Sequence, residues 1–210
     1  MNSELYFSVD IETNGLMPGF NSMISLGAVA FDLQTGQEYG TFLQNLVPDP
    51  DTVEDPGTME WWKGFPLKYI EATTNPLPPA EVLLNYATWW QGLAGDKTAV
   101  FSYWKPAFDG AFIRYYRYKF LKQQTNRFSD GVDIKTLAAT ALGWAYSDTK
   151  IETVPESYKG GLFHSHNALE DAIEQKNVLV SAYSIIRTAI NAPAIISKGP
   201  QPTDLLTQAQ

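Results

Sequence analysis

The stretch FSVDIETNG, residues 7–15, places Asp10 and Glu12 within one short apolar segment. Its composition is typical of a buried or half-buried β-strand. Because a strand alternates its faces with a period of two, the two carboxylates point to the same side. Like charges on an inner strand repel each other, and burial adds a desolvation cost unless a cation lies between them. The stretch therefore indicates either a solvent-facing pair or a divalent metal site that draws further carboxylates from elsewhere.

The overall charge limits how a polyanion would be held. The 210 residues suffice for one good-sized domain, and they contain 15 Lys and Arg against 23 Asp and Glu, a net charge of −8. A general nucleic-acid coat protein is more often basic. A polyanionic substrate would therefore need local attraction or bound metal ions.

The chain contains no cysteine, which excludes disulfides, thiolate zinc sites and cysteine nucleophiles. The N-terminal segment lacks the charged and apolar regions of a signal peptide. No apolar run approaches the ~20 residues that a membrane-spanning helix needs. The sequence predicts a soluble cytoplasmic protein with no membrane partner.

The order of apolar segments predicts an α/β fold. The first three strands follow one another, with a glycine-bearing turn between the second and third, which indicates an antiparallel meander with the first strand central. Helices then alternate with two further strands, which indicates a mixed sheet of about five strands flanked by helices. We expect one domain over residues 1–191 and a poorly ordered tail over 192–210. The expected strands are 5–12, 23–31, 38–46, 98–104 and a short one after 130; the expected helices are 58–65, 76–93, 107–124, one ending at Gly143, and 168–190, with a mobile polar loop over 144–165.

Further carboxylates stand at the starts of two of these helices. Asp109 follows the fourth strand in KPAFDGAFIRYY. An acidic residue in a first turn also complements the helix dipole, so the position alone does not distinguish a metal ligand from a dipole partner.

The segment HSHNALEDA combines a histidine with another carboxylate. Asn167 is a good N-cap, with Glu170 three residues later. His166 then lies on a loop just outside the helix, and Asp171 lies in its first turns. This arrangement suits a movable base beside a fixed ligand, and a surface histidine is the alternative. We interpret His164 as a neighbour or a substrate contact.

Three segments together resemble the motifs of the DEDDh (DnaQ-like) 3′-5′ exonucleases, over residues 5 to about 185: VDIET, FD and HNALED. MEWWKG and TWWQGL are also similar to segments of a phage and bacterial branch of that family. The resemblance implies an RNase H-like fold and two-metal phosphodiester hydrolysis. Where the second motif often has an Asn, this chain has Trp104 and Lys105. We interpret the tryptophan pairs 61–62 and 89–90 as core.

The resemblance also assigns roles to single residues. Asp10, Glu12 and Asp171 would hold the metal that activates water, and Asp10 with Asp109 the second metal. His166 would be the general base. The ions would be two Mg²⁺ or Mn²⁺, which prefer hard oxygen ligands.

The turn after the first motif is the expected substrate contact: Thr13, Asn14, Gly15 and Leu16. By resemblance, the Thr13 backbone would reach the terminal sugar and Leu16 would wedge against the last base. An ordinary glycine turn with a packed leucine is the alternative.

The leading hypothesis is a metal-dependent 3′-5′ exonuclease that acts on single-stranded DNA or RNA 3′ ends. An exoribonuclease or oligoribonuclease with the same site, a non-catalytic nucleic-acid-binding module on the same fold and a plain α/β domain are the alternatives. The sugar preference stays open because a few local contacts read the 2′-OH. The oligomeric state also stays open, with a homodimer as one option.

Overall fold

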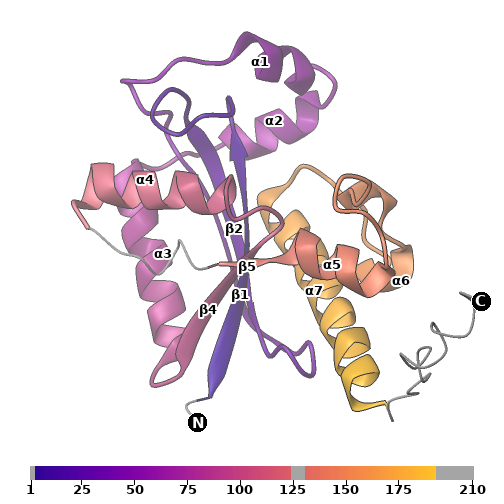
Figure 1. Ribbon diagram of the computed structural model, residues 1–210. Helices are drawn as coiled ribbons and strands as arrows, with labels where there is room; N and C mark the ends of the chain where they lie inside the picture. Colours follow the sequence, from indigo (N-terminus) through magenta and orange to yellow (C-terminus); the bar gives the residue numbers. More distant parts are fainter. Residues whose placement is uncertain (1–2, 124–130, 193–210) are drawn as a thin grey trace, which may run out of the picture.

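The computed structural model describes residues 3–123 and 131–192. Its centre is a mixed sheet of five strands in the order β3-β2-β1-β4-β5 (Figure 1). β1 pairs antiparallel with β2 and parallel with β4, so the first strand is central, as predicted. The strands are β1 (Glu4–Thr13), β2 (Met23–Phe31), β3 (Glu38–Asn45), β4 (Thr98–Tyr103) and β5 (Val132–Asp133).

Helices cover both faces of the sheet. On one face the apolar core joins the sheet to α3 and α4, and on the other a second apolar cluster joins it to α5 and α7. α1 and α2 lie beyond one end of the sheet (Figure 1). The helices are α1 (Pro56–Trp62), α2 (Pro66–Thr73), α3 (Pro79–Ala94), α4 (Asp109–Leu121), α5 (Ile134–Leu142), the 3₁₀ helix η1 (Ile151–Thr153), α6 (Glu156–Lys159) and α7 (Ala168–Asn191).

Successive side chains of β1 point to opposite faces of the sheet, and the two carboxylates share one face. Phe7 and Val9 are fully buried in the cluster under α3 and α4, whereas Tyr6 packs in the cluster under α5 and α7. Because Asp10 and Glu12 share the parity of Tyr6, they face α7. The same-side prediction for the two carboxylates is confirmed.

A glycine lets α7 approach the sheet closely. Gly27 on β2 is the register partner of Asp10. A Cβ atom on Gly27 would lie 2.2 Å from the carbonyl carbon of Ala168, the first residue of α7. Only a residue without a side chain fits this contact, and it brings the first turns of α7, with Asp171, against β1.

Two predicted segments differ from the structure. The helix expected over 58–65 is α1, which ends at Trp62, and a second short helix that was not predicted, α2, begins at Pro66. The loop expected over 144–165 contains η1 and α6, and Ile151 and Val154 within it are buried. Helices of one turn are too short to leave a hydrophobic period in the sequence. The mobility of this segment stays a prediction.

No helix within residues 3–123 and 131–192 combines the length and the apolar character needed to cross a membrane. The division into a domain over 1–191 and a tail stays a prediction, and residues 193–210 lie outside the described part of the chain.

Candidate active site

A pocket of about 840 Å³ lies where the end of β1 meets the starts of α4 and α7. Of the six carboxylates that line it, the four predicted by the motifs come from three separate segments of the chain. Asp10 and Glu12 come from β1, Asp109 is the first residue of α4, and Asp171 lies in the first turns of α7. His164 and His166, on the loop before α7, line the same pocket. The structure therefore brings together all five residues that the three motifs predicted.

Three of the carboxylates are in close contact. Oxygen atoms of Asp10, Glu12 and Asp171 lie within 4.8 Å of one another. Asp109 is also buried, and its charge acts on both Asp10 and Glu12. Carboxylates this close, with oxygen donors alone, form the type of ligand set that Mg²⁺ and Mn²⁺ prefer.

The protein by itself leaves this negative charge largely unbalanced. Burial, and then the neighbouring carboxylates, raise the pKa of Asp10 and of Glu12 well above their usual values. Burial raises the pKa of Asp109 to about 7, although backbone hydrogen bonds and the charge of Lys105 oppose the shift. Bound cations would favour the ionised forms and reverse these shifts.

Gln175 holds Asp10 in place. Its Nε2 donates to Asp10 Oδ1 at 2.7 Å, and its Oε1 accepts the backbone N–H of Trp104 at 3.1 Å. Gln175 thus ties the central strand to the segment that follows β4. Sequence reasoning missed this residue, although its position four residues after Asp171 on one helix placed it on the same face.

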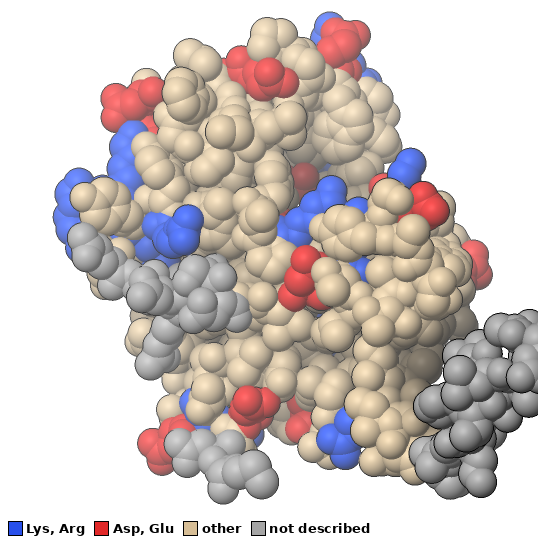
Figure 2. All heavy atoms as spheres, viewed as in Figure 1, with Lys and Arg blue, Asp and Glu red and all other residues tan. Residues whose placement is uncertain are grey.

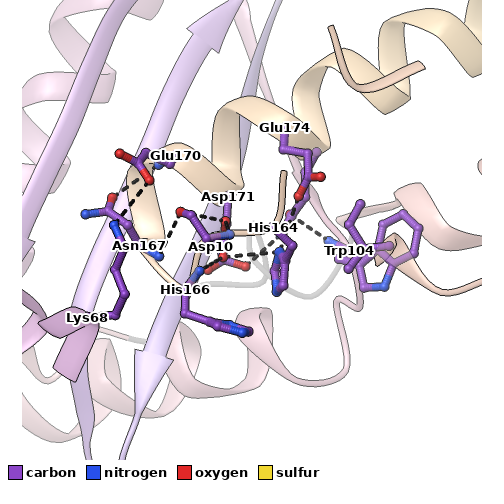
Figure 3. Close-up of polar contacts among 12 residues, drawn as sticks. Asp10, Lys68, Trp104, His164, His166, Asn167, Glu170, Asp171 and Glu174 are labelled. Atoms are coloured by element: carbon purple, nitrogen blue, oxygen red, sulfur yellow. Dashed lines mark hydrogen bonds and ion pairs between the residues drawn. The ribbon is translucent and has the colours of Figure 1, made fainter. Parts of the chain in front are cut away.

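Asp171 organises the loop before α7 (Figure 3). Its carboxylate accepts the backbone N–H groups of Ser165 at 2.7 Å and His166 at 3.0 Å. The side chain of Asn167 accepts the N–H groups of the next helical residues, which confirms the predicted N-cap. His166 therefore lies outside the helix, as the cap predicted, and its φ of 57° is in the left-handed region.

The imidazole of His166 is packed among aromatic rings. Its centroid is 4.7 Å from that of Trp61 and 4.3 Å from that of Phe65, both edge-on. Burial, and then the charge of His164, lower the pKa of His166 to about 4. The ring is therefore neutral at pH 7 and able to accept a proton.

The tryptophan pairs are only partly core. Trp62 and Trp90 are buried, but Trp61 is 43% exposed and lines the pocket, so its interpretation as core was wrong. Adjacent residues on a helix point about 100° apart, so at most one of a pair faces the core squarely.

His164 contacts two buried carboxylates. Its Nδ1 lies 3.2 Å from Asp171 Oδ2 and 3.3 Å from Glu174 Oε2. Burial lowers the pKa of His164, but the hydrogen bond with Glu174 and the charge of Asp171 outweigh it, so the pKa is raised overall. Glu174 also pairs with Lys159 at 3.3 Å. His164 is a neighbour of the carboxylates, which agrees with one of its two interpretations.

The predicted substrate-contact turn divides in two. Thr13 and the exposed Leu16 line the pocket. Asn14 is buried and its side chain accepts the backbone N–H of Ser22 at 2.6 Å, so it fixes the turn. A Cβ on Gly15 would overlap the side chain of Asn21. Asn14 and Gly15 therefore do not line the pocket, because they pack against other residues of the turn.

Comparison with known proteins identifies the class. The 3′-5′ DNA exonuclease Cap18 of Escherichia coli is 27% identical over 175 residues, which is 81% of this chain and 87% of Cap18. The nuclease domain of 3′hExo, a DEDDh family member bound to rAMP, superposes with a TM-score of 0.62 at 16% identity, covering 86% of this chain and 92% of that one. Escherichia coli Exonuclease I in complex with a dT13 oligonucleotide gives 0.64 at 16% identity, covering 90% of this chain and 43% of that one.

The fold is thus that of a class of solved exonucleases that includes a DEDDh family member. Within it, the chain belongs to the family described as the 3′-5′ exoribonuclease Rv2179c-like domain, whose model matches residues 6–183. The protein is therefore a 3′-5′ exonuclease by family.

The raised carboxyl pKa values predict that the metal-free protein loses stability as the pH rises. A carboxyl group whose pKa is higher in the folded state stabilises the fold at low pH, and this contribution is lost between its unfolded and folded pKa values. For Asp109, from 3.8 to about 7, the loss between pH 5 and pH 8 is about 2–3 kcal/mol. Urea unfolding in EDTA should show wild type losing this much relative to Asp109→Asn, whose side chain cannot ionise.

Addition of Mn²⁺ at pH 8 should raise the stability of wild type above that of the variant, because the ionised cluster binds the ion. Parallel stability curves for the two proteins between pH 5 and pH 8 would contradict the shift at Asp109.

Proposed function

We propose that this protein removes nucleotides from single-stranded 3′ ends by metal-dependent hydrolysis, at the pocket that holds Asp10, Glu12, Asp109 and Asp171. The observation that carries the proposal is the convergence of these carboxylates beside a neutral histidine in one pocket. The family, which is described as a 3′-5′ exoribonuclease domain, supports the direction of hydrolysis.

The donor set fits two Mg²⁺ or Mn²⁺ ions. Four carboxylates carry −4 when ionised, which two divalent ions balance. Burial raises the pKa values of all four, and repulsion between carboxylates adds to this at Asp10 and Glu12. Asp10, Glu12 and Asp171 would hold one ion, and Asp10 with Asp109 the other. Bound ions would supply positive charge to the attacking and departing oxygens of the phosphodiester.

The remaining roles fall to the protein's own side chains. His166 accepts the proton of the attacking water, because its ring is neutral near pH 7 and borders the pocket. Gln175 fixes the orientation of Asp10 through its hydrogen bond. Leu16 and Trp61 offer exposed apolar surface on the pocket wall for the terminal nucleotide.

Single-stranded ends are the proposed substrate on the strength of the relatives. Exonuclease I was solved with dT13 and a 3′-exonuclease with a histone mRNA stem-loop. The family description names an exoribonuclease, whereas Cap18 is named a DNA exonuclease. DNA and RNA are therefore both candidate substrates, and the same pocket would serve either.

The test is a labelled-end assay. The protein is incubated with 5′-labelled single-stranded DNA or RNA of matched sequence, with Mg²⁺ or Mn²⁺, and with EDTA as the control. We expect a ladder that shortens one nucleotide at a time in the presence of metal and no products in EDTA. The relative rates rank the two sugars. Release of internal fragments, or hydrolysis that survives EDTA, would overturn the proposal.

The cytoplasmic location and the homodimer stay predictions from the sequence.

A further inference from the structure

A protein of net charge −8 that acts on a polyanion needs local positive charge. The two proposed ions balance the four carboxylates and leave little charge for the rest of the strand. Figure 2 shows basic side chains beside a hollow on one face of the molecule, with acidic atoms recessed within it. The basic residues that line the pocket are therefore candidates for binding the rest of the strand.

Three lysines line the pocket: Lys105 after β4, Lys135 in the first turn of α5, and Lys150 just before η1. Within residues 3–123 and 131–192, none of them lies within 4.0 Å of a carboxylate oxygen. In this they differ from the lysines that form ion pairs, which are Lys63, Lys68, Lys119, Lys159 and Lys176. The three lysines, here called the lysine wall, therefore bring to the pocket lining positive charge that no ion pair among the described residues neutralises.

Lys135 is the most informative member of the lysine wall. Only 8% of its surface is exposed, yet it borders the pocket. Its Nζ lies 4.1 Å from the centroid of the Tyr146 ring. A cation–π contact holds an ammonium in place without neutralising its charge. Buried lysines are rare unless they are paired, so this residue indicates an anion that is bound during function.

The direction of hydrolysis limits which anion Lys135 can bind. In a 3′-5′ exonuclease the terminal nucleotide lies at the carboxylates, and the rest of the strand extends only to the 5′ side. Any phosphate other than the scissile one therefore lies on the 5′ side. Lys105 follows β4, and Lys135 and Lys150 come from the segments around α5 and η1, whereas Trp61 comes from α1. The lysine wall and the aromatic surface are therefore built from different elements.

We propose that Lys135, flanked by Lys105 and Lys150, binds a backbone phosphate on the 5′ side of the scissile bond. This inference rests on the proposed function, because it takes the carboxylate pocket as the place of hydrolysis. It assigns a second recognition element, for the substrate backbone, that is independent of sequence and of the sugar.

The first test replaces the charge. Lys135→Gln should raise KM for a single-stranded oligonucleotide about tenfold and change kcat less than about threefold, since a phosphate contact contributes to binding along the whole reaction path. The slope of log Kd against log salt concentration, measured by fluorescence anisotropy in EDTA, should fall by about 0.7. Lys135→Arg, which keeps the charge, should restore most of the affinity.

Lys97→Gln is the matched control. Lys97 also lies over a tyrosine ring, 5.3 Å from the centroid of Tyr39, but it does not line the pocket. Its substitution should leave KM and the salt slope at wild-type values. Lys150→Gln, at an exposed position, provides the same measurement should Lys135→Gln fail to fold.

The second test locates the phosphate. A single neutral methylphosphonate is moved along the linkages 5′ of the scissile bond, and affinity is measured for wild type and for Lys135→Gln. At one linkage the methylphosphonate should weaken binding to the wild-type protein. At that same linkage it should not weaken binding to Lys135→Gln any further. Additive effects at every linkage, or a Lys135→Gln variant that matches Lys97→Gln, would overturn the inference.

The two proposals fail in different ways. A wild-type protein that binds the oligonucleotide with this coupling but releases no nucleotides would overturn the proposed function and keep the phosphate contact. A wild-type protein that shortens the oligonucleotide but shows no coupling between Lys135 and any linkage would keep the proposed function and overturn the phosphate contact.

Discussion

Replacing Asp10 with Asn is expected to lower kcat by about 10³-fold or more, since the loss of a shared metal ligand removes several kcal/mol of transition-state stabilisation. Asp10 lies close to the other three carboxylates. Its oxygen lies within 4.8 Å of those of Glu12 and Asp171, and it also senses the charge of Asp109. An Asn keeps the shape and can still accept the hydrogen bond from Gln175, so the fold should persist. Single-turnover hydrolysis of a labelled oligonucleotide measures the effect.

Stability measurements separate a lost ligand from a damaged fold. In EDTA at pH 8 the Asp10→Asn variant should melt at a higher temperature than wild type, because one of several repelling buried charges is gone. With Mn²⁺ the order should reverse. Glu81→Gln, at an exposed position on α3, is the control and should change neither the rate nor the response to metal. Undiminished hydrolysis by Asp10→Asn would refute the assignment of Asp10 as a metal ligand.

Local rules predicted how several of the candidate site residues are placed, and the family resemblance joined them into one site. The two-residue period of a strand placed Asp10 and Glu12 on one side, and the helical cap at Asn167 placed His166 outside α7. Each rule involves only a few neighbouring residues and a strong stereochemical preference. The order of strands and helices then predicted the mixed sheet, because a three-stranded meander followed by alternating helices and strands has few ways to pack.

The residues that sequence reasoning missed depend on contacts between distant elements. Trp61 and Phe65 surround His166 from about 100 residues away, and α1 is too short for its pattern to show which side faces the pocket. Lys135 looked like any helical lysine until the structure buried it over Tyr146. The reason for a glycine at position 27 likewise becomes visible only once the position of α7 is known, because a side chain there would overlap the α7 backbone.

Replacing His166 with Asn is expected to lower kcat by about 10²–10⁴-fold, the usual contribution of a general base. The affinity for single-stranded oligonucleotide should change less than about threefold, because the nearby apolar surfaces of Trp61 and Phe65 remain. Asn is the suitable substitution because, like His, it tolerates the left-handed backbone found here. Single-turnover rates and anisotropy in EDTA give the two quantities separately.

The response to metal tells a base from a ligand. Ring nitrogens of His164 and His166 and an oxygen of Asp171 also lie within 4.8 Å of one another, so His166 has a second conceivable role as a metal ligand. A general base contributes nothing to metal affinity, and the Mn²⁺-induced rise in melting temperature should therefore persist in His166→Asn, although it is lost in Asp10→Asn. If His166→Asn loses that rise as well, His166 coordinates the ion. If it keeps both the rise and the full rate, the proton passes to another group. Only a slow variant that still binds metal and oligonucleotide fits the role of a general base.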